Sequence, residues 1–151
     1  MFMACCAGRS IGQDGTLDIS FNVGTGLNQQ IFAMAIQADG KVLVGGLFTS
    51  YNGTPCNYLA RLNADGSFDN TFSIGTGPND KVTAMAVQPD GKILVGGHFV
   101  FFNGVLQNHL ARLNSNGSLD PTFVPDFIGL SPSLKIQVQP DGKILVLEDP
   151  A

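Results

Sequence analysis

The chain has 151 residues, of which 44% are hydrophobic and 13% charged, with a formal net charge of −4. The charged fraction is about half of the ~25% found in average soluble domains, and 19 glycines imply frequent turns, so a helical bundle is disfavoured. Only 8 basic residues accompany 12 acidic ones, so we expect neither nucleic acid nor an anionic membrane surface as a partner.

No targeting or membrane segment stands out in the sequence. No apolar run approaches the ~20 residues that cross a bilayer, and residues 1–7 lack the basic start and long apolar centre of a secretory signal. We therefore expect cytoplasmic synthesis without membrane insertion. The final location stays open, and exposure as part of a virion or surface assembly is one setting for such a chain.

The cysteines and histidines do not form a recognisable pattern. Cys5, Cys6 and Cys56 are odd in number, which favours free thiols over a disulfide framework. His98 and His109 have no cysteine or carboxylate at zinc-like spacing. We therefore predict no metal site at these residues.

An internal repeat dominates the sequence. Two markers recur every 51 residues without insertion: an Asp/Asn-Gly-Ser/Thr-Leu/Phe-Asp block at 14–18, 65–69 and 116–120, and Asp-Gly-Lys at 39–41, 90–92 and 141–143. We interpret residues 1–151 as a single repeat domain, with repeats at 14–64, 65–115 and 116–151. A fixed period near 50 residues is the size of one β-propeller blade.

The pattern within one copy is typical of β-structure. In the second repeat, short apolar runs at 82–87, 92–95, 106–113 and 119–123 are separated by the turn residues Gln88-Pro89-Asp90-Gly91, by a loop that ends in Asn103-Gly104, and by Ser115-Asn116-Gly117-Ser118. The first turn predicts a hairpin, because proline presets φ and glycine accepts a positive φ. The sequence thus predicts an all-β fold with one four-stranded antiparallel sheet per repeat.

Three linked blocks carry a resemblance to a known family. Residues 88–97 read QPDGKILVGG, residues 110–114 read LARLN, and residues 116–123 read NGSLDPTF. Together they resemble the delta-60 repeat, a bacterial β-propeller repeat family, and the resemblance covers nearly the whole chain from Asp14 onward. It implies a propeller-like arrangement of blades, often in large surface or secreted proteins, with no settled biochemical activity.

The repeats need a neighbour to close, since three blades are fewer than the ~4–8 of a propeller. The third copy lacks its later strands, while residues 5–13 align with one of them, so this segment would complete repeat 3 within one chain or across two. The residues expected at the closure are Cys5, Ile11, Ile144 and Val146. One architecture is a six-bladed ring made by a homodimer, and the alternative is a monomeric β-prism of three sheets.

The third repeat differs from the others at two small residues. Ala33 and Ala35 match Ala84 and Ala86, whereas the third copy has Lys135 and Gln137 at these positions. Small residues let neighbouring sheets approach closely. We therefore expect one face of the third sheet to be more polar and solvent-exposed and to have a different neighbour, which weighs against a uniform ring.

The sequence predicts no catalytic machinery and no cofactor. Asp18, Asp69 and Asp120 recur in register, but each copy offers too few oxygen ligands for calcium, so we expect them to cap turns or to pair with Arg61 and Arg112. No Ser-His-Asp or Cys-His constellation repeats, and Gly24-Thr25-Gly26 lacks the rest of a phosphate loop. The chain is therefore expected not to be an enzyme.

A non-catalytic structural or interaction module is the function that fits best. Its repeated loops would present equivalent contacts to a second copy of the chain and to a protein or surface glycan partner. The alternative is a lectin-like carbohydrate-binding module. The residues proposed for its ligand loops are Asn28, Asn79, Tyr51, Phe101 and Phe102.

Overall fold

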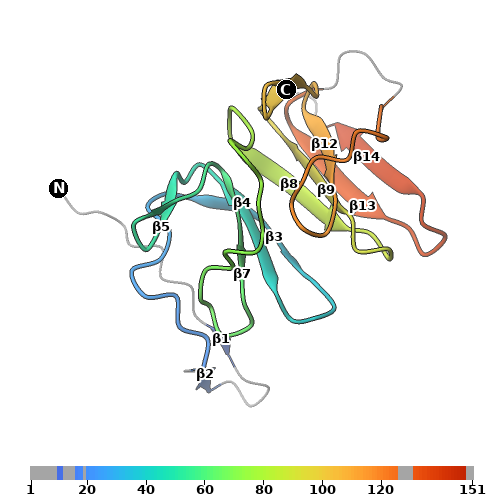
Figure 1. The fold of residues 1–151 in the computed structure, drawn as a ribbon. Coiled ribbons are helices and arrows are strands. Elements are labelled where there is room, and N and C mark those ends of the chain that lie inside the picture. Colours follow the sequence, from blue (N-terminus) through green and yellow to red (C-terminus); the bar gives the residue numbers. More distant parts are fainter. Residues whose placement is uncertain (1–9, 12–15, 19, 126–130, 149–151) are drawn as a thin grey trace.

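The fold is described here from a computed structural model, which describes residues 10–11, 16–18, 20–125 and 131–148 (Figure 1). Every regular element in these residues is a strand, and none is a helix that could cross a membrane. The first repeat contains β3 (Ile31–Ile36), β4 (Val42–Gly46), β5 (Ser50–Tyr51), β6 (Thr54–Pro55) and β7 (Leu59–Leu62). The second contains β8 (Val82–Val87), β9 (Ile93–Gly97), β10 (Phe101–Phe102), β11 (Val105–Leu106) and β12 (Leu110–Leu113). The third contains β13 (Leu134–Val138) and β14 (Ile144–Glu148), while β1 (Ser10–Ile11) precedes the repeats and β2 (Leu17–Asp18) lies at the start of the first.

The repeats form three antiparallel sheets. The first sheet has the order β3-β4-β7, the second has the equivalent order β8-β9-β12, and the third is the hairpin β13-β14. β5-β6 and β10-β11 are separate small hairpins. The all-β prediction with antiparallel sheets is confirmed for the described residues.

The expected fourth strand of each sheet is reduced to a single bridge. Leu62 at the end of the first repeat pairs with Phe68, and Leu113 at the end of the second pairs with Leu119, so each partner comes from the start of the following repeat. One residue further on the chain turns, because the backbone N–H of Phe72 donates to the carbonyl of Asp69. This turn ends the pairing, so the first two sheets each have three strands where four were expected.

The Asp-Gly-Lys turn closes the same hairpin in each repeat. In the second, the N–H of Gln88 donates to the carbonyl of Lys92 at 2.8 Å, and Gly91 adopts a φ of 82°. The equivalent bonds join Gln37 to Lys41 and Gln139 to Lys143. The hairpin predicted from this turn is confirmed, because β8 and β9 pair antiparallel across it.

A pair of glycines accommodates a bulge in the first two sheets. The register shifts between Ile31 and Ala33, and a Cβ on Gly46 would lie 2.0 Å from the carbonyl oxygen of Gln30. The second sheet repeats this shift, with Gly97 in the same role. In the third repeat Leu147 and Glu148 stand at the glycine positions, and β13 pairs with β14 without a shift.

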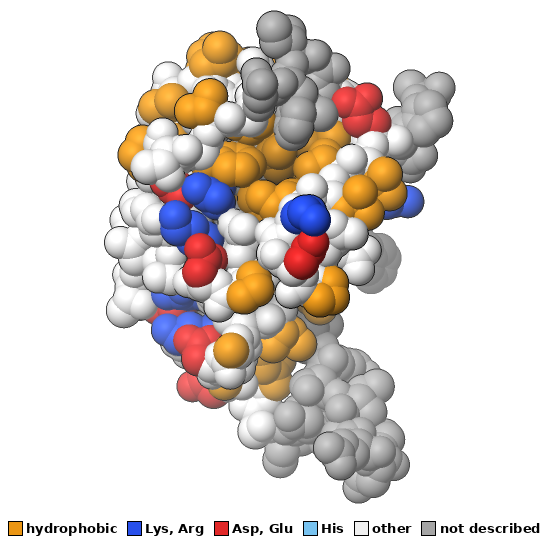
Figure 2. All heavy atoms as spheres, turned by 90° about the vertical axis from the view of Figure 1, so that its right-hand side faces the viewer, with side chains coloured by type: hydrophobic (Ala, Val, Ile, Leu, Met, Phe, Trp, Pro, Cys, Tyr) orange, Lys and Arg blue, Asp and Glu red, His pale blue; other side chains and the backbone are white. Residues whose placement is uncertain are grey.

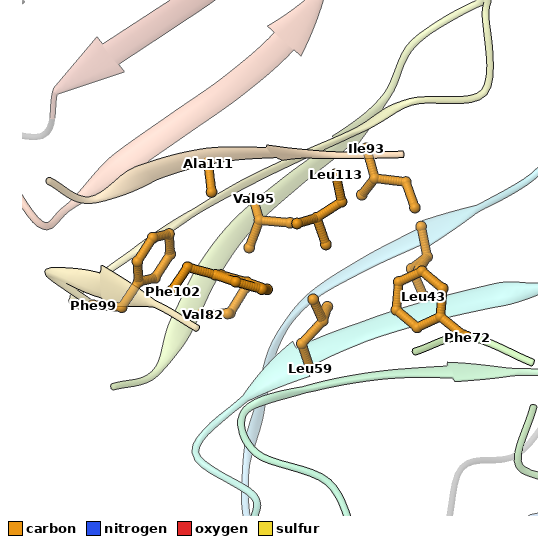
Figure 3. Packing of buried hydrophobic residues seen from close by; sticks show 10 residues of the cluster. All are labelled: Leu43, Leu59, Phe72, Val82, Ile93, Val95, Phe99, Phe102, Ala111 and Leu113. Atoms are coloured by element: carbon orange, nitrogen blue, oxygen red, sulfur yellow. The ribbon is translucent and has the colours of Figure 1, made fainter. Parts of the chain in front are cut away.

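The sheets are stacked in chain order, with β8 beside both β3 and β13 (Figure 1). In the core between the first two sheets, Leu43 and Leu59 face Val82 and Val95 (Figure 3). The outer faces of the end sheets remain exposed, as at Met34 and at the outer strand of the third sheet. A closed three-sheet prism would cover these faces.

The N-terminal strands are the counterparts, 51 residues earlier, of an outer strand and its bridge partner. β1 pairs with β2 through Ile11 and Leu17, and these positions lie 51 residues before the bridged pair Leu62 and Phe68. Among the described residues β1 pairs with β2 alone, and Figure 1 places both at the opposite end of the stack from β13 and β14. Of the proposed closure residues, Ile144 and Val146 pair within the third sheet, and Cys5 lies outside the described residues.

Candidate interaction surface

The recurrent aspartates are the centres of a repeated ionic cluster. Asp69 accepts from Lys41 Nζ at 2.8 Å and from Arg61 Nε at 2.7 Å, and its other oxygen accepts from the N–H and hydroxyl of Thr71. The guanidinium of Arg61 also lies 4.5 Å from the centre of the Phe72 ring. Asp120 has the equivalent set of partners: Lys92, Arg112 and Thr122.

These clusters have a structural role. Burial alone would raise the pKa of Asp69, but the hydrogen bonds from Lys41, Thr71 and Arg61 outweigh burial and hold the pKa well below its usual range. The second nitrogen of Arg61, Nη1, donates to the carbonyl of Ser115 at 2.6 Å and so ties the first repeat to the second. The prediction that the aspartates pair with Arg61 and Arg112 is confirmed for Asp69 and Asp120. No group of three metal-ligating side chains occurs in the described residues.

Two of the proposed ligand residues hold their own loops. The amide oxygen of Asn28 accepts from the N–H groups of Thr49 and Ser50, at 2.9 and 3.1 Å. Asn79 binds the N–H groups of Val100 and Phe101 in the same way. The amide oxygen of each asparagine is therefore occupied by hydrogen bonds from the backbone of the β4–β5 or β9–β10 connection.

The proposed aromatic ligand residues divide into two groups. Tyr51 is 1% exposed and donates its hydroxyl to the carbonyl of Gly66, and Phe102 is fully buried. Phe101 is 43% exposed and lines a hollow of about 410 Å³ with Tyr58, Asn79 and others. Only Phe101 of the three presents a ring to solvent.

The outer face of the first sheet carries apolar side chains that sequence reasoning did not single out. Met34 and Ile36 of β3 are 62% and 71% exposed. Beside Met34 lies a small apolar groove of about 50 Å³, which Val42, Val44 and Leu62 help to line. We call Met34, Ile36 and this groove the open face. The signal that could have found it is the repeat itself, since the residues 51 positions later, Met85 and Val87, pack in the core.

The opposite end of the stack has a mixed surface. Leu145 and Leu147 of β14 are 41% and 54% exposed, and Lys135 and Gln137 lie on the paired strand opposite Leu147 and Leu145. Figure 2 views the molecule from the side on which Figure 1 places the third sheet, and it shows apolar side chains interspersed with Lys, Asp and Glu. The two ends of the stack therefore differ in chemistry.

Comparison with known proteins finds a similarity to a β-propeller family. A family model described as "Domain of unknown function (DUF5122) beta-propeller" matches residues 37–72 and 88–123. Each matched segment runs from the Asp-Gly-Lys turn through the glycine pair and the Leu-Ala-Arg-Leu strand to the ionic cluster. No curated protein and no solved structure matches the chain. The prediction of β-propeller repeats is thus confirmed over these two segments, which are similar to the DUF5122 beta-propeller family.

Proposed function

We propose that this protein is a non-catalytic interaction module of β-propeller type, which docks another protein on the open face of its first sheet. The observation that carries the proposal is the exposure of Met34 and Ile36. Their counterparts Met85 and Val87 pack against the core between the first and second sheets. The same apolar positions are thus used for sheet packing inside the chain and are available at its open face.

The distribution of charged and apolar groups supports this proposal. The recurrent lysine, arginine and aspartate side chains are engaged in the two ionic clusters, where they hold turns and link repeats. The open face, in contrast, offers large apolar side chains beside an apolar groove. Removal of such surface from water favours association by about 25 cal/mol per Å² of apolar area, before the cost of ordering is subtracted.

Sedimentation across a range of protein concentrations tests the proposal. We expect weak self-association of the wild type at high concentration, because exposed apolar faces bury one another. The variant Met34→Glu/Ile36→Glu should remain monomeric at the same concentrations. Leu145→Glu/Leu147→Glu is the matched control on the other end of the stack, and it should behave like the wild type.

Three other results would be informative in this experiment. A wild type that stays as monodisperse as the open-face variant up to its solubility limit contradicts the proposed function. Loss of association in both variants would instead indicate the six-bladed homodimer ring, since closing that ring uses both ends of the stack. Loss in the control variant alone would place the interaction on the third sheet and contradict the open-face proposal.

A second candidate function is carbohydrate binding at the hollow beside Phe101. An exposed ring next to amide and hydroxyl groups, here those of Asn57 and Thr76, is a surface on which a sugar ring can stack and form hydrogen bonds. A glycan array tests this candidate. Binding by the wild type that Phe101→Ala removes would support it, and an array without binding would eliminate it.

A further inference from the structure

We infer that the open face is shaped for one kind of occupant: a further β-propeller-type sheet that presents a bare glycine to Met34. The third sheet of a second copy of this chain does not have that property. This inference rests on the proposed function and deepens it, because it states which partner the open face accepts. It comes from comparing the interfaces inside the chain with the faces left exposed at its ends.

Both interfaces inside the chain place a large apolar side chain over a glycine. A Cβ on Gly45 of the first sheet would lie 2.5 Å from Cγ1 of Val82 and 3.3 Å from Cε of Met85. A Cβ on Gly96 of the second sheet would lie 2.8 Å from Cδ1 of Ile136. Real Cβ atoms essentially never come within 3.0 Å of such a neighbour, so the contacts of Val82 and Ile136 require that no side chain be present at Gly45 and Gly96.

The glycine lies in a setting of other small residues. Gly45 pairs with Ala33 across β3 and β4, and Gly96 pairs with Ala84 across β8 and β9. We call each of these pairs, with the alanine two residues further along the same strand, a glycine socket. The socket lets the following sheet approach closely, and the following sheet fills it with the apolar residues of its first strand.

The first sheet carries the side chains that fill a socket. Ile31, Met34 and Ile36 stand 51 residues before Val82, Met85 and Val87, which cover the Gly45 socket or pack beside it. In β8 these side chains pack against the core, whereas Met34 and Ile36 in β3 are mostly exposed. The open face therefore repeats the socket-filling surface of the second sheet, with no sheet packed on it among the described residues.

The third sheet has lost its socket. Leu147 stands where the first two sheets have glycine, and Lys135 and Gln137 replace the two alanines. A Cβ added at this position in the first sheet would already lie 2.5 Å from the Val82 side chain above it, so a whole leucine side chain does not fit under Met34 and Ile31. Covering Lys135 with apolar groups would add a desolvation cost.

The N-terminal strands provide a second contact for the same occupant. By the 51-residue period β1 is the counterpart of β7, and in the first sheet β7 pairs with β4 through Leu62 and Val42. An arriving sheet could therefore add the edge of its middle strand to β1 while its socket covers Met34. The occupant thus consists of the two inner strands of a repeat, joined by a turn and carrying the glycine.

A donor chain tests the inference directly. The donor combines Lys135→Ala, Gln137→Ala and Leu147→Gly, which restore a socket on the third sheet, with Met34→Glu and Ile36→Glu, which block its own open face. We expect the donor to form a 1:1 complex with the wild-type chain in sedimentation or calorimetry. The affinity should exceed wild-type self-association by at least about tenfold. The matched acceptor Met34→Glu/Ile36→Glu should not bind the donor.

The possible failures can be told apart. Wild-type self-association through the open face, without tighter binding of a folded donor, overturns the glycine-socket inference and leaves the proposed function intact. A wild-type dimer that is disrupted by Met34→Glu/Ile36→Glu and equally by Leu145→Glu/Leu147→Glu shows that the unmodified third sheet fits the open face, and it also overturns the inference. Absence of any association that depends on the open face contradicts both.

The donor must be shown to fold before its binding is interpreted. Its circular dichroism and its cooperative thermal transition should match those of Met34→Glu/Ile36→Glu. If glycine at position 147 prevents folding, the donor is rebuilt with Leu147→Ala. This alanine donor is expected to bind the wild-type chain more weakly than the glycine donor and more tightly than a chain with the unmodified third sheet. A folded alanine donor whose affinity does not exceed that of the unmodified third sheet would overturn the inference.

Discussion

Val82 packs directly over Gly45, so that a Cβ on the glycine would lie 2.5 Å from Cγ1 of Val82 and 3.0 Å from its Cβ. This contact joins β4 of the first sheet to β8 of the second. Val82 is fully buried and belongs to the same apolar cluster as Leu43 and Leu59 of the first sheet. The two sheets can thus pack this closely only because residue 45 has no side chain.

Gly45→Ala should therefore destabilise the protein by about 2 kcal/mol, because overpacking forces Val82 and its strand to move. Gly96→Ala is the matched comparison. Its nearest neighbour is the flexible end of Ile136, at 2.8 Å, so its cost should be smaller. Urea denaturation measures both free energies of unfolding, and a Gly96→Ala variant less stable than Gly45→Ala would contradict this account.

Asp69→Asn should lower the free energy of unfolding by about 3 kcal/mol, because it leaves the buried guanidinium of Arg61 without its carboxylate. Asp141→Asn is the control, since Asp141 and Lys143 form an exposed ion pair in the equivalent hairpin of the third repeat. Loss of an exposed pair is expected to change stability by no more than about 0.5 kcal/mol. Equal effects in the two variants would show that the ionic cluster contributes little.

Stability should fall as the pH drops below about 4. The pKa of Asp120 is held well below its ordinary value by hydrogen bonds from Lys92, Thr122 and Arg112, and that of Asp69 is lowered by its equivalent partners despite burial. The unfolded chain then binds protons more readily than the folded one, so unfolding takes up protons and acid favours it. The contribution is present above the unfolded-state pKa and is lost as the pH falls through the folded-state pKa.

The double variant Asp69→Asn/Asp120→Asn tests this assignment. It should be less stable than the wild type at neutral pH and should lose stability less steeply in acid. Thermal unfolding recorded from neutral pH to about pH 2 measures both slopes. Parallel slopes for the two proteins would assign the acid sensitivity to other carboxylates.

Cys56 should be unreactive in the folded protein. Burial raises the pKa of its thiol to about 11 and covers the sulfur. In a Cys5→Ser/Cys6→Ser background at about pH 8, we expect a disulfide reagent to modify Cys56 at least about a hundredfold more slowly in buffer than in denaturant. Fast modification in buffer would show that the region around Cys56 opens readily.

Thr83→Val should stabilise the protein by about 1 kcal/mol. The hydroxyl of Thr83 is buried and has no hydrogen-bond partner among the described residues, whereas valine has the same shape without a polar atom. The other repeats have Phe32 and Leu134 at this position, so an apolar side chain suits the site. A raised midpoint in urea with an unchanged slope is the expected result, and a lowered midpoint would reveal a partner for the hydroxyl.

The local architecture could be predicted from the sequence because it depends on neighbouring residues. The Gln-Pro-Asp-Gly turn forms a hairpin wherever it occurs, since glycine at position 91 adopts the positive φ that the turn requires. The period of 51 residues then implies the same sheet in each copy, which holds for the first two repeats. The pairing of Asp69 with Arg61 was also foreseeable, because both recur in register.

Other features depend on which surfaces meet. Asn28 and Asn79 looked like ligand residues, but each binds backbone groups 21 and 22 residues further along the chain, an encounter that no local pattern announces. Tyr51 and Phe102 are buried by the same loops.

The sequence by itself determined the period, the hairpins and the ionic partners, because each of these follows from short-range chemistry repeated in register. Only the tertiary structure decided what the differences between repeats mean. The change from Gly45 and Gly96 to Leu147 is visible in the alignment of the repeats, but its consequence requires the position of Val82 above the glycine. Close packing tolerates no additional atoms at that contact, so one side chain distinguishes a sheet that accepts a neighbour from one that does not.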